Sequence, residues 1–287
     1  QLTQALAKGA RDMGAKIVRF CPVTGVEHLG DEWKISTPNG EIRAEYVVNA
    51  AGYRASELGA MFGRDVPCVS LAHQYLITEP IPELTARDKK LPLLRDPDSS
   101  YYLRQEKDGL LLGPYEKNCR AHWLEADDPM PDDFSFQLYN DDLERLEWYI
   151  EDACARVPIL GTAGITRVVN GPIPYTPDGL PLIGPMPGVQ NAFEACVFTF
   201  GIVQAGGAGK LLAEMIIEGE TESDSWAVDP RRFTDHVDVR YTAAKAIETY
   251  SHEYAMHFPQ IQWPAGRKAK CSPLYDRLEE AGAEFGS

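Results

Sequence analysis

The stretch that most constrains the fold is YVVNAAG at residues 46–52, an apolar run that ends in small residues. Apolar runs without polar alternation are typical of strands that are covered on both faces, as in parallel sheets. A short helix is expected to follow over residues 55–62. Small residues at the carboxyl end of such a strand let a ligand approach the backbone, as in open α/β sheets. The alternative is that Ala51 and Gly52 simply let a helix pack closely.

Periodicity and turn residues predict the other elements near the N-terminus. Residues 2–14 carry apolar side chains at helical spacing and predict one amphipathic helix. Strand-like segments follow, separated by Gly30-Asp31 and by Asn39-Gly40. The second of these pairs is among the strongest short hairpin signals.

The middle of the chain has a different pattern of predicted secondary structure. Residues 71–82 and 99–116 predict strands, and Lys107-Asp108-Gly109 predicts a hairpin turn in the second of them. Residues 133–157 predict an amphipathic helix. Its expected inward-facing side chains are Leu138, Leu143, Leu146, Tyr149 and Ile150. We therefore expect an antiparallel sheet with one helix.

A glycine-rich segment, GIVQAGGAGK at residues 201–210, follows an expected strand at 192–199. We interpret it as a turn that leads into a helix over residues 207–218. It matches neither the P-loop, because Leu211 follows Lys210, nor the Rossmann fingerprint, because the G-x-G start is missing. Two readings remain open. The helix N-terminus could face a negatively charged ligand, or the glycines could allow close helix packing.

Charge and composition exclude several classes of protein. A net charge of −15 without a basic run argues against nucleic acid as a partner. No stretch is long and apolar enough to cross a membrane, and no secretory signal is present, so we expect a location inside a cell. The six cysteines show no C-x-x-C pair, so we expect neither a metal site nor a disulfide framework.

Five segments taken together resemble the dimethylglycine and sarcosine dehydrogenases, flavoproteins of the D-amino-acid-oxidase superfamily. The segments are VVNAAGYRASELG, LAHQYLITEPIP, RDPDSSYYLRQEKDGLLLGPYE, NGPIPYTPDGLPLIGP and FGIVQAGGAGKLLAEMIIEGE. The third also carries the hairpin, and the fourth is the most specific. Members of this family begin with a glycine fingerprint for FAD, which is missing here, and many continue into a folate-binding domain. We therefore expect a middle portion of a longer protein.

The resemblance implies an α/β (α+β) fold with an interrupted domain organisation. Residues 1–65 and 171–228 are expected to form a partial FAD-binding domain with a parallel sheet. Residues 66–170 are expected to form a substrate domain built on an antiparallel sheet. Residues 229–287 are expected to form a C-terminal helix and a linker to a further domain, on which tetrahydrofolate would bind.

The resemblance also assigns residues to the cofactor. Val23 matches the position beside the adenine, and the Ala51-Gly52 turn matches the family's phosphate-proximal turn. A third segment matches the pyrimidine edge of the flavin, where reduction leaves negative charge that a helix N-terminus stabilises. Its residues are Gly201, Ile202, Val203 and Gln204.

The substrate is expected to lie above the flavin ring. His73 and Tyr102 match the histidine and tyrosine that the family places there, and a histidine that titrates near neutrality suits an amine substrate. Because side chains alternate along a strand, Tyr102 and Arg104 are expected on one face, where Arg104 could bind a carboxylate. The alternatives are a packed core histidine and a surface Tyr–Arg pair.

The expected function is oxidative N-demethylation of a small N-methylated amino acid, of the dimethylglycine or sarcosine type, by hydride transfer to FAD. Either oxygen or an electron-transfer protein could reoxidise the flavin, whose attachment could be covalent or not. The expected location is a bacterial cytoplasm or a mitochondrial matrix, and the oligomeric state is left open. Two alternatives stand beside this function: a silent regulatory or binding protein on the same fold, and an inert fragment without flavin.

Overall fold

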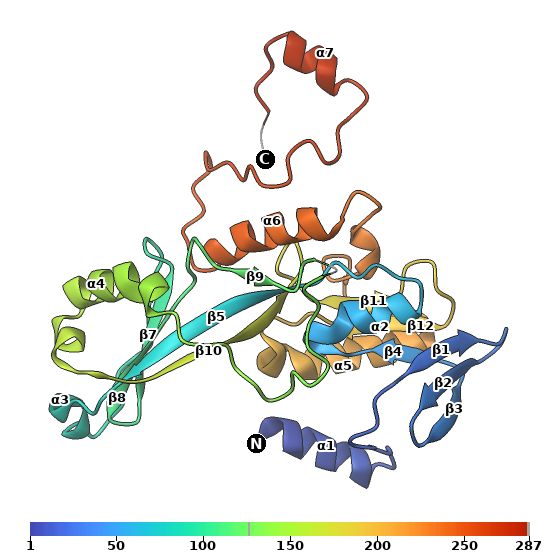
Figure 1. The fold of residues 1–287 in the computed structure, drawn as a ribbon, viewed down its shortest axis with the longest axis horizontal. Coiled ribbons are helices and arrows are strands. Elements are labelled where there is room, and N and C mark those ends of the chain that lie inside the picture. The colour runs from blue at the N-terminus through green and yellow to red at the C-terminus, as the bar shows by residue number, and fades with distance from the viewer. Residues whose placement is uncertain (126, 286–287) are drawn as a thin grey trace. The chain divides into compact units, whose positions relative to one another are not determined.

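The computed structural model describes residues 1–125 and 127–285. Backbone contacts divide the chain into two units (Figure 1). The α/β unit consists of Gln1–Cys68 and Leu180–Asp235, and the antiparallel unit of Val69–Gly179 and His236–Ser287. The unit boundary differs from the one expected at residue 171: residues 171–179 lie in the antiparallel unit, into which strand β10 continues as far as Tyr175.

The α/β unit is centred on a three-stranded sheet with the order β11-β12-β4. Its strands are β4 (Val47–Asn49), β11 (Leu182–Pro185) and β12 (Ala192–Cys196). β4 pairs with β12 in parallel, as the apolar run predicted. The expectation that both faces of β4 are covered is wrong for Val48, which is 39% exposed.

Helices and a hairpin sheet complete the α/β unit. α5 (Gly201–Glu218) packs Ala208, Leu212 and Met215 against Ile183 and Phe193 of the sheet. The short η1 (Gly52–Arg54) and α2 (Ala55–Met61) follow β4, and η4 (Pro230–Arg232) lies near the unit's end. The turns at Gly30-Asp31 and Asn39-Gly40 are confirmed: they join β1 (Gly25–His28), β2 (Trp33–Thr37) and β3 (Gly40–Ala44). α1 (Leu2–Asp12) is amphipathic and has no buried residue.

The antiparallel unit contains a six-stranded sheet with the path β10-β5-β8-β7-β6 and β9 paired to β5. All of its pairings are antiparallel, as expected, and the Lys107-Asp108 turn joins β7 to β8. The strands are β5 (Val69–Thr78), β6 (Leu94–Asp96), β7 (Tyr101–Glu106), β8 (Gly109–Pro114), β9 (Ala121–His122) and β10 (Ile165–Tyr175).

Helices cover the two faces of this sheet. Leu76, Leu103 and Leu112 lie in register across three strands and pack against Leu146 and Ala153. The elements on that side are α3 (Pro82–Thr85), η2 (Leu143–Leu146), α4 (Glu147–Arg156) and η3 (Pro158–Thr162). α6 (Val239–Ser251) packs against β5 through a second cluster that includes Leu71, Ala243, Ala246 and Tyr250 (Figure 1). α7 (Tyr275–Glu280) lies in the C-terminal segment.

The helix predicted over residues 133–157 is wrong in its first half. Helical structure begins only at Leu143, with η2 and then α4. The segment before it bonds to the sheet instead: the amide of Tyr139 donates to the carbonyl of Asn170, and the side chain of Asn170 donates to the carbonyl of Asn140. Consequently Leu138 and Leu143 are half-exposed, whereas Leu146 and Tyr149 are buried as expected.

The glycine-rich turn is a second correction. Residues 201–206 already belong to α5, which begins at Gly201 and runs through all the glycines of GIVQAGGAGK. A Cβ atom added at Gly206, Gly207 or Gly209 would meet nothing within 4 Å. Within the described residues, these glycines therefore do not mark a close packing contact.

In the part of the chain that the structure describes, no helix combines the length and the apolar character that a membrane span requires.

Candidate functional site

His73 lies on β5, on the face of the sheet that α6 covers. Its Nδ1 atom is 2.9 Å from the hydroxyl of Tyr250 on α6. Its ring also lies against Tyr115, with ring centroids 4.9 Å apart. The imidazole is therefore held by a hydrogen bond from the helix and by an aromatic ring from the end of β8.

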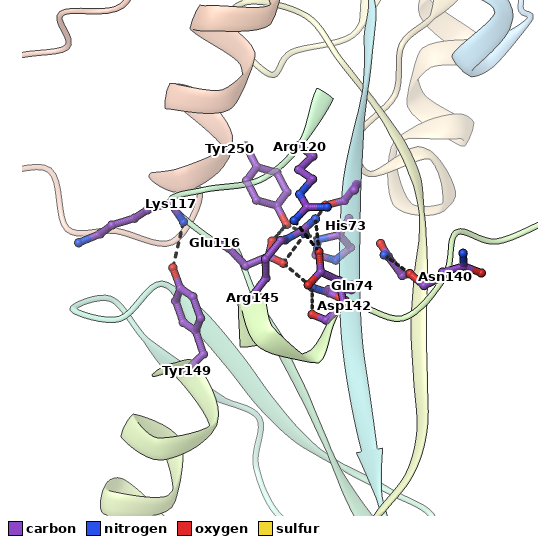
Figure 2. A network of polar contacts seen from close by, with 12 residues as sticks. His73, Gln74, Glu116, Lys117, Arg120, Asn140, Asp142, Arg145, Tyr149 and Tyr250 are labelled. Carbon is purple, nitrogen blue, oxygen red and sulfur yellow. Dashed lines mark hydrogen bonds and ion pairs between the residues drawn. The ribbon is translucent and has the colours of Figure 1, made fainter. Parts of the chain in front are cut away.

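A buried polar network continues from this contact (Figure 2). The hydroxyl of Tyr250 donates to Oε2 of Glu116 in a short hydrogen bond. Oε1 of Glu116 accepts from Arg145 at 2.7 Å and from Gln74 at 3.1 Å. Tyr250 is fully buried and Glu116 is 1% exposed, so these protein groups replace water as partners.

Arg145 is fixed by further contacts beyond Glu116. Its guanidinium donates to the carbonyl of Ala72 at 3.1 Å and lies 3.9 Å from Asp142. Asp142 in turn pairs with Arg120 at 3.2 Å, and its carbonyl accepts from Gln74. The network thus ties β5, the end of β8 and η2 to the helix that carries Tyr250 (Figure 2).

The environment of His73 sets its charge. Burial lowers the pKa of His73 to about 4, Glu116 acts in the opposite direction, and Arg145 adds to the lowering. The imidazole is therefore neutral at neutral pH. The expectation that this histidine titrates near neutrality is corrected: burial outweighs the attraction of the carboxylate.

Tyr102 lies on the same sheet face as His73. Strand register places Leu76, Leu112 and Leu103 on one face of the sheet. His73 is an odd number of residues from Leu76, and Tyr102 is next to Leu103, so alternation points both side chains to the other face. Burial raises the pKa of Tyr102 to about 12, so the hydroxyl stays protonated. The register of the Tyr101-Tyr102 doublet is clear, since Tyr101 is fully buried on the opposite face.

The ring of Tyr102 fits over Gly113 of the neighbouring strand. A Cβ atom at Gly113 would lie 2.3 Å from Cζ of Tyr102, so only glycine leaves room for this ring. Tyr102 also meets Tyr254 edge to face, with ring centroids 6.0 Å apart. Tyr254 also contacts Tyr115, which places His73 and Tyr102 around one group of aromatic rings.

Arg104 lies two residues beyond Tyr102 on the same face, as strand alternation predicted. Its guanidinium forms a short ion pair with Glu106, and the two side chains are 41% and 31% exposed. Arg104 is thus accessible, but a carboxylate of the protein already occupies part of its hydrogen-bonding capacity.

In the α/β unit, Ala51 and Gly52 form a turn at the carboxyl end of β4. Asn49, which is fully buried, accepts from the amide of Ala51 and donates to the carbonyl of Ala55 at 2.9 Å. Gly52 has φ +62°, a conformation that glycine adopts without strain. Asn49 therefore shapes the turn that the sequence indicated.

The first turn of α5 follows β12, the parallel neighbour of β4. Asn49 and Glu194 are in register, so the Ala51-Gly52 turn and the start of α5 follow strand ends at one edge of the sheet. Val23 lies in the loop between α1 and β1 and is half-buried.

The start of α5 has features that suit a flavin. The first amides of a helix have no partner within the helix, and they carry partial positive charge. The Oε1 atom of Gln204 is buried and has no hydrogen-bond partner among the described residues. Ile202 and Val203 are 63% and 81% exposed, which is unusual for apolar side chains. Donors, an unsatisfied acceptor and apolar surface together fit a heteroaromatic ring.

The cysteines and histidines provide no metal centre within the described residues, where no group of three ligand-type side chains converges. All six cysteines are unpaired.

Sequence reasoning missed Tyr250, Glu116, Arg145 and Gln74. Tyr250 meets His73 across a separation of 177 residues and Glu116 across 134. The one local signal was Glu116 itself, a charged residue two positions after the apolar strand GLLLGP.

Comparisons with known proteins give a consistent result. The model of the family described as FAD dependent oxidoreductase matches residues 1–215, and the model of an FAD dependent oxidoreductase central domain matches residues 218–272. The mitochondrial dimethylglycine dehydrogenase of Mus musculus is 43% identical over 284 residues, covering 97% of this chain and 32% of that protein. The mitochondrial sarcosine dehydrogenase of Homo sapiens is 37% identical over 291 residues, covering 98% of this chain and 30% of that protein.

A similar fold occurs in a solved structure, the L-proline dehydrogenase from P. horikoshii. It has a TM-score of 0.64 and 27% sequence identity, and the match covers 80% of this chain and 58% of that one. The chain described here spans about a third of the length of the two curated relatives.

Proposed function

Because this chain belongs to the FAD-dependent oxidoreductases, whose family model matches residues 1–215, we propose that it forms the substrate side and part of the flavin side of an enzyme that oxidises a small N-methylated amino acid. Relatives that act on dimethylglycine and sarcosine by name support this substrate class. The observation that carries the proposal is that His73 and Tyr102 lie on one face of the antiparallel sheet, around a shared group of aromatic rings.

FAD supplies the two-electron acceptor for a hydride from the N-methyl carbon. The first turn of α5 would hold its pyrimidine edge through the leading amides and Gln204, with Ile202 and Val203 against the ring. Ala51 and Gly52 would lie near its phosphates, and Val23 near its adenine. The amides of a helix N-terminus favour the negative charge that reduction leaves on the flavin.

His73 would prepare the amine. An amine can lose a hydride from its methyl carbon only when its nitrogen lone pair is available, so a cationic substrate must first lose a proton. With a pKa of about 4, the imidazole of His73 is too weak a base to hold that proton itself, so we propose that its neutral nitrogen orients the amine by accepting a hydrogen bond from the N–H group. Tyr102, which keeps its proton, donates to the substrate, and Arg104 binds the carboxylate.

An anaerobic titration of the complete flavoprotein tests this function. Dimethylglycine or sarcosine should bleach the oxidised flavin spectrum. Trimethylglycine should not bleach it, because its quaternary nitrogen has no lone pair to release, and neither should glycine, which has no N-methyl carbon. The relative rates with the first two amines then identify the substrate.

Site variants of the same protein extend the test. His73→Ala should slow flavin reduction on the order of a hundredfold. His28→Ala, at an exposed histidine of the α/β unit, is the matched control. A protein that is colourless after purification, or whose flavin is not reduced by either amine, would favour a regulatory or binding role instead.

The reoxidant and the location extend the same proposal. Both curated relatives are dehydrogenases by name and mitochondrial, which favours an electron-transfer protein over oxygen and a mitochondrial matrix over a bacterial cytoplasm. Oxygen consumption during turnover would contradict the first choice. Tetrahydrofolate remains an expected acceptor of the one-carbon unit in the longer protein.

A further inference from the structure

We infer that Tyr250 and Glu116 are positioning residues, which hold the imidazole of His73 with its proton on Nδ1 so that Nε2 presents a lone pair to the substrate amine. This inference rests on the proposed role of His73. It concerns residues far from it in sequence, which act through the histidine and not on the substrate.

The direction of each hydrogen bond follows from the chemistry of the groups. Arg145 and the Nε2 amide of Gln74 can only donate, and both donate to Oε1 of Glu116. Glu116 is therefore held as an acceptor, with Oε2 left for Tyr250. The single hydroxyl proton of Tyr250 points to that oxygen.

The orientation of Tyr250 then decides the tautomer of His73. Since its only proton is committed to Glu116, the Tyr250 oxygen can interact with Nδ1 of His73 only as an acceptor. Nδ1 must therefore carry a hydrogen. A neutral imidazole has one N–H group, so Nε2 carries none.

Burial makes this arrangement strict. Tyr250 is fully buried, and the side chains of Glu116 and Arg145 are 2% and 9% exposed. With the other tautomer, the lone pair of Nδ1 would face the lone pairs of Tyr250, and water has little access to relieve the conflict. The arrangement is analogous in logic to a carboxylate that fixes a catalytic histidine, with a tyrosine inserted between the two.

The surrounding elements also explain why the hydrogen-bonded chain Glu116–Tyr250–His73 is rigid. α6 presents Tyr250 from a helix whose N-terminus is capped by Asp238, which accepts from the amide of Tyr241 at 2.7 Å. The ring of Tyr250 packs on Tyr115 and Tyr175, with centroids 4.8 and 5.7 Å apart. The hydroxyl therefore has a fixed position between Glu116 and His73.

The experiment combines nitrogen NMR with rapid-reaction kinetics on the complete flavoprotein. ¹⁵N-labelled histidine distinguishes the two tautomers by the shifts of the ring nitrogens, and His73→Gln identifies the signals of residue 73. The wild-type signals should show a protonated Nδ1 and an unprotonated Nε2. If the wild-type protein carries the proton on Nε2, the inference is overturned, and no variant of Tyr250 or Glu116 is needed to decide it.

Tyr250→Phe keeps the ring and removes only the hydroxyl. In this variant we expect His73 to lose its preference for the tautomer with the proton on Nδ1. Flavin reduction at saturating amine should be slower on the order of a hundredfold, and the dissociation constant of the substrate should change little. Tyr149→Phe is the matched control, because it also removes a buried hydroxyl, one that accepts from the amide of Lys117 and does not touch His73.

The outcomes separate this inference from the proposed function. If His73→Ala leaves reduction unchanged, the proposed role of His73 fails. If His73→Ala slows reduction but Tyr250→Phe changes neither rate nor tautomer, only the positioning role fails. Slower reduction in Tyr250→Phe with the wild-type tautomer would also overturn it, because that result indicates a merely structural tyrosine.

Discussion

The guanidinium of Arg145 lies 2.7 Å from the carboxylate of Glu116, and the two side chains are only 9% and 2% exposed. This ion pair joins η2 to the end of β8 and supports the carboxylate that Tyr250 contacts. Burying two charges is favourable only when each is well partnered, so the pair is sensitive to the loss of one member.

Arg145→Met should therefore lower the free energy of unfolding by about 3 to 5 kcal/mol, because Glu116 would remain buried without its cation. Adding Glu116→Gln to Arg145→Met should recover part of that loss. Urea denaturation measures both effects. Arg120→Met is the control: its side chain is 64% exposed, so losing its pair with Asp142 should cost at most about 1 kcal/mol. Equal losses in the two arginine variants would contradict this view of the network.

The lowered pKa of His73 predicts a dependence of stability on pH. The pKa falls from 6.5 to about 4 in the folded state, so the unfolded chain binds more protons between these values. The contribution is fully present above pH 6.5 and is lost as the pH falls toward 4. Its size is at most about 3 kcal/mol. The charged groups that act on His73 are Glu116 and Arg145, with Tyr250 and Tyr115 against the ring.

Free energies of unfolding at pH 7.5 and 5 check this prediction. His73→Gln should show a smaller loss on acidification than the wild type. In His28→Gln, the free energy of unfolding should change between the two pH values by the same amount as in the wild type. A His73→Gln curve parallel to that of the wild type would rule out the buried neutral imidazole.

The raised pKa of Glu194, in the α/β unit, predicts a dependence of stability on pH that is opposite to that of His73. It is fully buried on β12, and Arg64 lies 3.4 Å away without forming a hydrogen bond to it. Burial raises the pKa of Glu194, and Arg64 opposes the change. The folded state thus keeps the proton to higher pH than the unfolded chain. The associated stability is present below the ordinary pKa range of glutamate and is lost as the pH rises through the raised pKa.

Glu194→Gln should remove this loss, so on going from pH 4 to pH 7 the stability of the variant should fall less, or rise more, than that of the wild type. Glu41→Gln, at an exposed position of β3, serves as the reference. Identical pH profiles for Glu194→Gln and the wild type would mean that the carboxylate is ionised without penalty.

Gly113 and Tyr102 should be energetically coupled. Gly113→Ala would place a methyl group 2.3 Å from Cζ of Tyr102, so the ring must shift and its contact with Tyr254 must change. We expect a loss of about 1 to 3 kcal/mol, most of which disappears in a Tyr102→Ala background. Gly25→Ala is the control, since its nearest neighbour would be 3.9 Å away. Additive effects in the double-mutant cycle would refute the coupling.

Arg104 and Glu106 should have opposite effects on substrate binding. Arg104→Gln removes the proposed partner of the substrate carboxylate and should raise KM about tenfold, with the limiting rate of reduction little changed. Glu106→Gln frees the guanidinium from its ion pair and should lower KM. Steady-state kinetics of the complete enzyme with each variant measure both shifts. An unchanged KM in Arg104→Gln would remove this residue from the substrate site.

Local signals in the sequence were sufficient for the elements that depend on neighbouring residues. The hairpins at Asn39-Gly40 and at Lys107-Asp108-Gly109, the parallel strand at VVN and the shared face of Tyr102 and Arg104 follow from turn residues and from side-chain alternation. These features depend on interactions within a few residues of the chain.

Tertiary structure decided what local patterns could not. Residues 134–142 have a helical pattern, but the backbone groups of Tyr139, Asn140 and Asp142 find partners in β10 and β5 instead. The glycines of GIVQAGGAGK are helical, since packing of Leu212 and Met215 on the sheet outweighs their low helix propensity. The neutral state of His73 also depends on tertiary structure. Its cause is burial beside Tyr250 and Glu116, side chains that only the folded chain brings together.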